Sequence, residues 1–273
     1  MQGMPANLPL NLPLPPAQPW ADPLPVSVPA PVPAPLAERL ARVDDARLAR
    51  DLDAGGCAII DRLLTPAMCD ALSAAYDDSG PPGQPRYRSR IVMQRHGFGR
   101  GEYQYFAYPL PDLVAALRLA FYPRLVGIAN AWNARLGSDA RYPAAHAEFL
   151  EACHAAGQTR PTPLILRYGA GDYNCLHQDL YGEHVFPLQV AVLLSEPGRD
   201  FEGGEFVLTE QRPRQQSRVE VVDLRQGDAV VFAVNERPVA GTRGDYRVKL
   251  RHGVSRVRAG SRYTLGIIFH DAA

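Results

Sequence analysis

The stretch that most constrains the fold runs from Pro163 to the end of the chain. Short apolar runs recur there, and prolines and glycines separate them at short intervals. Runs of this length, bounded by turn residues, are typical of β-strands. Such spacing favours an antiparallel sandwich or barrel. We predict strands at residues 164–168, 186–194, 204–208, 219–223, 228–234, 246–251 and 262–269.

The chain before Pro163 carries helical patterns instead. Apolar residues recur at helical spacing from Leu36 to a stop at Gly55-Gly56, and Thr65-Pro66 offers an N-cap followed by proline at the first helical position. Because helices come first and strands second, we expect an α+β protein with N-terminal helices packed on a β core. Further helices are expected at about 65–77, 111–136 and 143–156, with a first strand at 57–60.

Residues 1–36 differ from the rest of the chain. Twelve of the 26 prolines lie between Pro5 and Pro35, and each removes a backbone donor and fixes φ. We expect a disordered, extended tail, with a Pro-rich docking peptide as the alternative. One domain should follow over residues 37–273, with mainly helical support at 37–160 and the β core at 161–273.

The overall charge gives no reason to expect a nucleic-acid or membrane partner, because 29 basic residues balance 29 acidic ones. No apolar run approaches the roughly 20 residues that span a bilayer, and the N-terminus lacks the pattern of a secretory signal. The four cysteines are scattered, without a Cys-x-x-Cys pair, which fits reduced thiols. A cytoplasmic protein is the expectation.

Two histidines and two acids crowd into the segment Cys175–His184, behind a predicted strand. His177 and Asp179 are separated by one residue, so both side chains can leave an extended backbone on the same side and reach one metal ion. His252, at the end of a later strand, is the natural third ligand. Two histidines and one carboxylate on one face of an octahedron suit non-haem Fe(II) and oxygen chemistry.

Arg262 opens the last predicted strand, ten residues after His252. A buried arginine beside a metal is costly unless it meets an anion, and its planar fork fits a carboxylate bidentately. The structural alternative is an ordinary surface salt bridge.

The other polar side chains nearby receive smaller roles. Glu183 and His184 are out of phase with the ligand pair and should be structural or orient a ligand histidine. Gln178 should point away from the metal, and Asn174 should line the pocket or serve a turn. We expect His270 to be a capping surface residue and Cys175 to be packed in the core.

The order of these motifs resembles that of the Fe(II)/2-oxoglutarate-dependent dioxygenases, whose core is a double-stranded β-helix (jelly roll). The resemblance covers roughly two-thirds of the chain. The matching pieces are Tyr168-Gly-x-Gly, His177-Gln-Asp179, Gly203-Gly-Glu-Phe206, Gly227-Asp-Ala-Val-Val-Phe232, His252-Gly253 and Arg262.

The substrate branch is less clear from these motifs. Gly203-Gly-Glu-Phe206 looks like the prolyl-hydroxylase branch, although that branch usually places Lys at the anion-binding position. Leu176-His-Gln-Asp179 looks like the AlkB-type nucleic-acid dealkylases. Residues 86–273 as a whole also resemble a bacterial group described as oxygenases acting on damaged nucleic acid.

The resemblance implies cofactors and residue roles. With O2, oxidative decarboxylation of 2-oxoglutarate to succinate and CO2 would be coupled to substrate hydroxylation. The Fe(II) ligands would be His177, Asp179 and His252. The cosubstrate would be held by Arg262 at its distal carboxylate, with Tyr168 and Thr264.

Residues 86–108 are the only local indication of a partner. Five arginines alternate with tyrosines and phenylalanines against one acid, Glu102. Such a run could hold phosphates and stack a flipped base of alkylated nucleic acid. Alternatively it is a β-hairpin with packed aromatics and solvated arginines, and its glycines suggest a flexible turn that could act as a lid. The arginines are Arg86, Arg88, Arg90, Arg95 and Arg100.

Three functions therefore stay open. One is oxidative demethylation of alkylated nucleic acid, a DNA-repair activity. Another is prolyl-hydroxylase-like hydroxylation of a protein or small molecule. The third is a non-catalytic jelly-roll binding module, against which the complete ligand set and Arg262 argue.

Overall fold

The structure is a computed structural model that describes residues 34–180 and 182–273. Most of the predicted tail therefore lies outside the described residues. The first helix, α1 (Ala34–Leu40), begins inside the segment predicted as tail. Within the described ranges no helix is both long and apolar enough to cross a bilayer.

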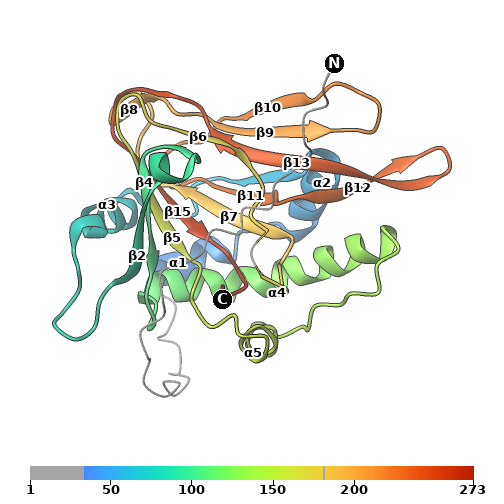
Figure 1. The fold of residues 1–273 in the computed structure, drawn as a ribbon, viewed down its shortest axis with the longest axis horizontal. Helices are drawn as coiled ribbons and strands as arrows, with labels where there is room; N and C mark the ends of the chain where they lie inside the picture. The colour runs from blue at the N-terminus through green and yellow to red at the C-terminus, as the bar shows by residue number, and fades with distance from the viewer. Residues whose placement is uncertain (1–33, 181) are drawn as a thin grey trace.

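Two antiparallel sheets form the core (Figure 1). The larger has the strand order β1-β11-β7-β15-β5-β4-β2, and the smaller has the order β10-β9-β13-β6-β3, with β12 paired to β13. The predicted α+β class with a jelly-roll core is confirmed. The strands are β1 (Cys57–Ile60), β2 (Tyr87–Val92), β3 (Gly99–Arg100), β4 (Glu102–Phe106), β5 (Leu164–Tyr168), β6 (Tyr173–His177), β7 (Leu188–Leu193), β8 (Phe201–Gly203), β9 (Phe206–Gln211), β10 (Arg218–Val222), β11 (Ala229–Ala233), β12 (Glu236–Gly241), β13 (Gly244–Val254), β14 (Val257–Gly260) and β15 (Arg262–Ile267).

The helices lie against the outer face of the larger sheet, as Figure 1 shows for the long helix α4. On β7, Val190 and Val192 join the cluster that contains the helix residues, whereas Ala191 and Leu193 face the space between the sheets. A strand covered on both faces reads as a continuous apolar run. The helices after α1 are α2 (Asp45–Gly55), α3 (Pro66–Ala74), α4 (Asp112–Arg135) and α5 (His146–Ala155), with 3-10 turns η1 (Ala75–Asp77) and η2 (Met93–His96).

Local signals explain why several predicted boundaries hold. The Thr65 hydroxyl accepts a hydrogen bond from the backbone of Met68 at 3.2 Å and caps α3. Gly56 ends α2 in the left-handed region, with φ 77°. Strands β2, β3 and β4 match the β-hairpin given as the alternative for residues 86–108. Four other strands were not predicted, because β8 and β14 are short, β6 carries polar and exposed side chains, and β12 contains Pro238.

Residues 87–106 connect both sheets at one end of the core. Strands β2 and β4 form a hairpin that extends the larger sheet through β5, whereas β3 pairs with β6 of the smaller sheet. Gly99 allows this second pairing, since a Cβ there would lie 2.3 Å from the carbonyl oxygen of Tyr173. The hairpin is thus tied to both sheets and closes one end of the jelly roll.

Candidate metal centre

Three side chains converge between the sheets. His177 ends β6, and the register of β6 with β13 places it directly opposite His252. Asp179 Oδ1 lies 3.4 Å from Nε2 of His177, and its Oδ2 lies 3.4 Å from Nε2 of His252. One ligand atom from each residue lies within 4.8 Å of the other two. Donor atoms at these separations can surround one metal ion.

The surroundings orient both imidazoles. Nδ1 of His177 lies 2.8 Å from the carbonyl oxygen of Cys175, so it carries the proton and leaves the Nε2 lone pair for a metal. The ring of His252 is buried against Phe232, with centroids 4.6 Å apart, and against Phe206. These contacts hold the site on an apolar wall.

The charges within the triad favour the metal-binding forms of two ligands. Burial alone would raise the pKa of Asp179, but the neighbouring His177 and His252 outweigh it and hold that pKa well below its usual value. Burial, and then the charge of a protonated His177, lower the pKa of His252. Burial would also lower the pKa of His177, but Asp179 outweighs it and raises that pKa, so a metal ion would displace a proton from that ring. An ionised carboxylate and a neutral imidazole are the states in which these groups bind a metal.

A buried arginine of the larger sheet faces the same space between the sheets. Arg262 begins β15 opposite Tyr168 of β5, is 1% exposed, and donates to the Thr264 hydroxyl at 2.5 Å. Burial lowers its pKa to about 10. Its Nε and the Tyr168 hydroxyl are buried and have no hydrogen-bond partner in the described part of the chain. A cation and a hydroxyl left in this way fit an anionic ligand.

The backbone next to Arg262 leaves room for its side chain. Gly204 has φ 64°, and a Cβ there would lie 2.9 Å from Cδ of Arg262. The acid whose charge acts on Arg262, Glu205, instead accepts from the Ser255 hydroxyl and lies 3.6 Å from Arg258. The guanidinium group is therefore not neutralised by a direct ion pair among the described residues.

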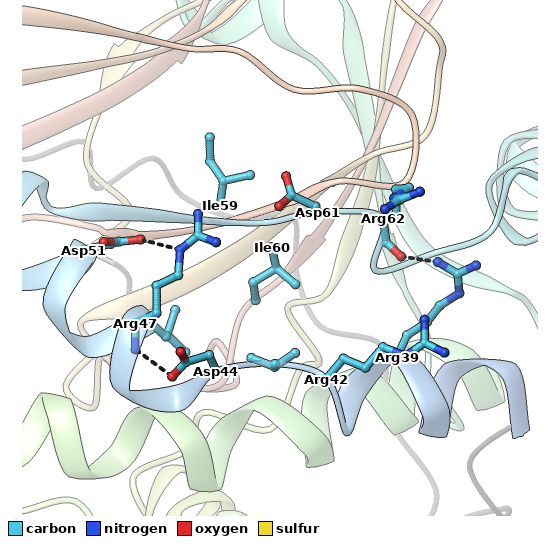
Figure 2. A pocket seen from close by; sticks show the side chains of 11 residues that line it. Arg39, Arg42, Asp44, Arg47, Asp51, Ile59, Ile60, Asp61 and Arg62 are labelled. Carbon is cyan, nitrogen blue, oxygen red and sulfur yellow. Dashed lines mark hydrogen bonds and ion pairs between the residues drawn. The ribbon is translucent and has the colours of Figure 1, made fainter.

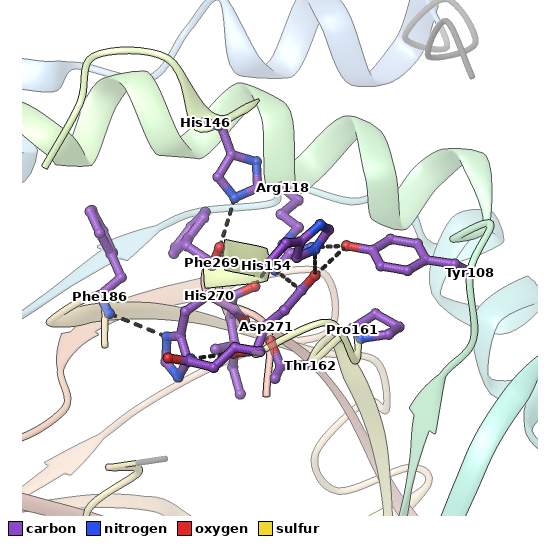
Figure 3. A network of polar contacts seen from close by, with 12 residues as sticks. Tyr108, Arg118, His146, His154, Pro161, Thr162, Phe186, Phe269, His270 and Asp271 are labelled. Carbon is purple, nitrogen blue, oxygen red and sulfur yellow. Dashed lines mark hydrogen bonds and ion pairs between the residues drawn. The ribbon is translucent and has the colours of Figure 1, made fainter. Parts of the chain in front are cut away.

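Two placements near the site were predicted wrongly. His270 is fully buried, not on the surface, because α4 and α5 cover the residues after β15; its Nδ1 accepts from the backbone of Phe186 at 3.2 Å (Figure 3). Cys175 is exposed, not packed in the core, because the outer face of β6 is open. Gln178 does point away from the metal centre and donates to Asn235.

The arginines of residues 86–108 do not act alike. Arg86 forms an ion pair with Asp78 at 2.6 Å, and Arg90 pairs with Glu102. Arg88 donates to the carbonyl oxygen of Pro161 and lies over the ring of Tyr105, 4.3 Å from its centroid. The two that remain exposed without an ion pair in the described chain are Arg95 and Arg100.

A separate cavity of about 300 Å³ lies at the opposite edge of the larger sheet, between α1, α2 and β1 (Figure 2). Two of its arginines are engaged within the lining: Nε of Arg47 lies 3.3 Å from Oδ2 of Asp51, and Arg39 donates to the carbonyl oxygen of Arg62. None of the predicted site residues lines it. Its chemistry gives no reason to prefer it to the metal centre.

Sequence reasoning overlooked one residue beside the site. Gln189 of β7 is 4% exposed and pairs with Phe232, whose ring contacts His252. Its Nε2 has no partner among the described residues. The available signal was a single glutamine inside an otherwise apolar run.

Comparison with protein families identifies the class. Residues 101–272 match the family described as "Oxygenase, catalysing oxidative methylation of damaged DNA". The chain belongs to this family of oxygenases. The predicted recognition and enzyme class, an oxygenase and therefore an oxidoreductase, are confirmed.

Two uncharacterised proteins of Mycobacterium tuberculosis, from strains CDC 1551 / Oshkosh and ATCC 25618 / H37Rv, are similar to the chain. Each is 47% identical over 209 residues, which cover 74% of this chain and 90% of the relative. Among solved structures, a 2OG-Fe(II) oxygenase-family oxidoreductase from Burkholderia pseudomallei has a TM-score of 0.49 and 18% identity, covering 85% of this chain and 94% of that one. A Pseudomonas putida prolyl-4-hydroxylase has a TM-score of 0.48 and 15% identity, covering 84% and 100%.

Proposed function

We propose that the protein is an Fe(II)- and 2-oxoglutarate-dependent dioxygenase. The observation that carries the proposal is a convergent His-Asp-His set on one sheet and, on the inner face of the other sheet, a buried arginine without an acid partner in the described residues. A structural ion pair would not leave the guanidinium group in this state.

The residue roles follow from this arrangement. A ferrous ion held by His177, Asp179 and His252 would supply the site at which O2 is activated. Arg262 binds the distal carboxylate of 2-oxoglutarate, and Thr264 fixes the orientation of the guanidinium group. The Tyr168 hydroxyl, buried beside it, donates to the same cosubstrate.

The overall reaction balances as an oxygenation. 2-Oxoglutarate, O2 and a substrate C–H bond give succinate, CO2 and a C–OH group, with one atom of O2 in succinate and the other in the hydroxyl group. On an N-methyl group the product is a hydroxymethyl amine, which releases formaldehyde and leaves N–H. The protein orients these groups and excludes water from them.

We infer that the substrate is alkylated nucleic acid, which the oxidation demethylates. The description of the matched family supports this class. Arg95 and Arg100 are exposed cations that make no ion pair with the described residues, and β3, which contains Arg100, lies beside β6. They can bind phosphates while the base enters the site. The catalytic domain would comprise residues 37–273. The four cysteines are free thiols, which fits a cytoplasmic protein.

Hydroxylation of a protein is the second candidate. It is supported by the motif Gly203-Gly-Glu-Phe206, in which Gly204 makes room for Arg262. A preference for an unmodified peptide over a methylated oligonucleotide would favour it.

The cofactor assignment is tested by succinate release from 2-oxoglutarate with Fe(II). We expect His177→Ala to lose activity and Fe(II) binding, and Arg262→Gln to raise the KM for 2-oxoglutarate. Arg141→Gln, at an exposed arginine outside the core, serves as the control. An active His177→Ala variant would exclude the proposed centre.

Binding of methylated single-stranded DNA against salt tests the substrate class. Each phosphate contact contributes a slope of about −0.7 in log K against log salt for single strands. We expect Arg95→Gln and Arg100→Gln each to reduce the slope by about one contact. If the slopes are unchanged, these arginines do not contact the phosphates of the bound DNA.

A further inference from the structure

The inner face of the larger sheet continues beyond the residues proposed to hold the cosubstrate. Paired residues of neighbouring antiparallel strands present side chains on the same face. Thr264 pairs with Leu166, which in turn pairs with Tyr103 of the hairpin. Tyr103 therefore lies on the surface that carries Arg262 and Thr264.

The next row of the register has small residues at its centre. Gly266 pairs with Ala191 on one side and with Leu164 on the other, and Leu164 pairs with Tyr105. The rings of Tyr103 and Tyr105 meet edge to face, with centroids 5.3 Å apart. The side chain of Leu164 covers Gly266, since a Cβ at that glycine would lie 2.8 Å from Cδ2 of Leu164. Tyr103 and Tyr105 form an aromatic wall at the hairpin edge of the row.

The hairpin edge of this row adjoins the metal centre. Tyr103 packs against the buried cluster that contains Phe206 and Phe232, and the rings of both contact His252. The ring of His270 contacts the backbone of Phe186, just before β7 begins. On the other flank, Gln189 pairs with Phe232, whose ring contacts His252.

Two buried N–H donors on these flanks are unused. Gln189 Nε2 and His270 Nε2 have no hydrogen-bond partner within residues 34–180 and 182–273. Since Nδ1 of His270 accepts from the backbone of Phe186, a neutral ring carries its proton on Nε2. Buried donors left unpaired are costly, so they point to a ligand with acceptor atoms.

One cation lies on this wall, since the guanidinium group of Arg88 lies over Tyr105. The nearby acids are engaged elsewhere: Glu102 pairs with Arg90 and Arg167, and Asp271 pairs with Arg118. Asp179 is the proposed metal ligand. Among these acids of the described residues, none is therefore left to neutralise a positively charged base bound here.

We propose that the target base is bound by five residues of this surface, and that the base is a neutral ring with carbonyl or ring-nitrogen acceptors. The five residues are Arg88, Tyr103, Tyr105, Gln189 and His270. The tyrosines contact the flat ring, while the amide and imidazole donate to its edge. Arg88 disfavours cationic alkylated bases. This inference rests on the proposed dioxygenase function and specifies its substrate.

The test compares two single-stranded oligonucleotides that differ in one base. One carries neutral 3-methylthymine, with two carbonyl acceptors, and the other carries cationic 1-methyladenine. We expect kcat/KM, measured by formaldehyde release, to be at least about 10-fold higher for the neutral base. Equal rates, or a preference for the cationic base, would overturn the charge assignment without touching the cofactor assignment.

Matched substitutions test whether Arg88 and Tyr105 contact the target base. Arg88→Met should reduce the preference for the neutral base about 5-fold, whereas Arg90→Met, the same change at a residue paired with Glu102, should leave the preference unchanged. Tyr105→Ala should raise the KM for the oligonucleotide about 10-fold, as expected for loss of one stacking contact, with the KM for 2-oxoglutarate within 2-fold of wild type.

The outcomes separate the two proposals. If wild type releases no succinate with Fe(II) and any substrate, the dioxygenase function fails. If wild type is active but Arg88→Met and Arg90→Met behave alike, and Tyr105→Ala leaves the oligonucleotide KM unchanged, the base-binding wall fails alone. Should Tyr105→Ala not fold, the substrate preference of wild type and of Arg88→Met still decides the assignment.

Discussion

Arg118 and Arg262 are both buried, at 2% and 1% exposure, but their partners differ. Arg118 of α4 forms an ion pair with Asp271 at 2.7 Å and donates to Tyr108 and to the carbonyl oxygen of Ile268 (Figure 3). Arg262 donates only to Thr264 among the described residues. A buried arginine that serves the fold finds its acid within the chain, whereas one that serves a ligand keeps its donors free.

The largest effect on stability is expected at Arg118. Arg118→Met leaves Asp271 buried without its cation, which destabilises proteins by about 3–5 kcal/mol. Urea unfolding, monitored by circular dichroism, measures the change. A loss below about 1 kcal/mol would mean that His154 and Tyr108, which also contact Asp271, suffice to stabilise its charge.

Ligand binding should stabilise the protein through Arg262. With Fe(II) under anaerobic conditions, 2-oxoglutarate at 100 times its Kd should add about 2.7 kcal/mol to the free energy of unfolding. The same concentration of 2-oxoglutarate should increase the free energy of unfolding of the Arg262→Met variant only slightly. An equal rise of Tm in both proteins would place the carboxylate elsewhere.

Acid should unfold the protein through the network around Arg118. Burial lowers the pKa of His146 and of His270 to about 4, so below the ordinary value of 6.5 the unfolded chain binds these protons first. Stability is therefore lost as the pH falls from about 6.5 towards 4. Each histidine should cost about 2 kcal/mol at pH 5.

Denaturant unfolding at pH 7.5 and pH 5 measures this loss. The variant His146→Phe, which keeps an aromatic ring against Tyr122, should lose less stability between the two pH values than wild type. A parallel loss in both would assign the acid sensitivity to other groups.

The contrast also explains what could be predicted from the sequence. The metal-ligand candidates share a local pattern, since His177 and Asp179 are two residues apart and His252 comes directly after the strand predicted at 246–251. In the network around Arg118, Asp271 lies 163 residues after Tyr108 and 153 residues after Arg118, so no local spacing links it to them. His270 was misplaced for the same reason, because its burial depends on helices far away in the chain.

The pairing register of the strands could not be predicted from the sequence either. Tyr103 reaches the inner surface only because β4 pairs with β5 and β5 with β15. Strand β6 carries the first ligand but escaped prediction, since its exposed face gives it no apolar run. The sequence thus indicated the chemistry, while the walls of the site needed the pairing of the strands.

A smaller effect is expected where the backbone passes Arg262. Gly204→Ala combines a φ of 64° with a Cβ 2.9 Å from Cδ of Arg262, which should cost about 1–2 kcal/mol. Because the clash displaces the guanidinium group, the KM for 2-oxoglutarate should rise as well. Gly83→Ala, with φ 79° and no atom near its Cβ, is the matched control for backbone strain alone.

The smallest effect on stability is expected at Arg262 itself, and it tests the comparison most directly. Arg262→Met removes a buried charge that lacks an acid partner and replaces it with an apolar side chain of similar length. Such exchanges are neutral or stabilising, so without ligand the free energy of unfolding should change by less than about 1 kcal/mol. A loss as large as that of Arg118→Met would show that Arg262 serves the fold, because a residue kept for its ligand contributes little until that ligand binds.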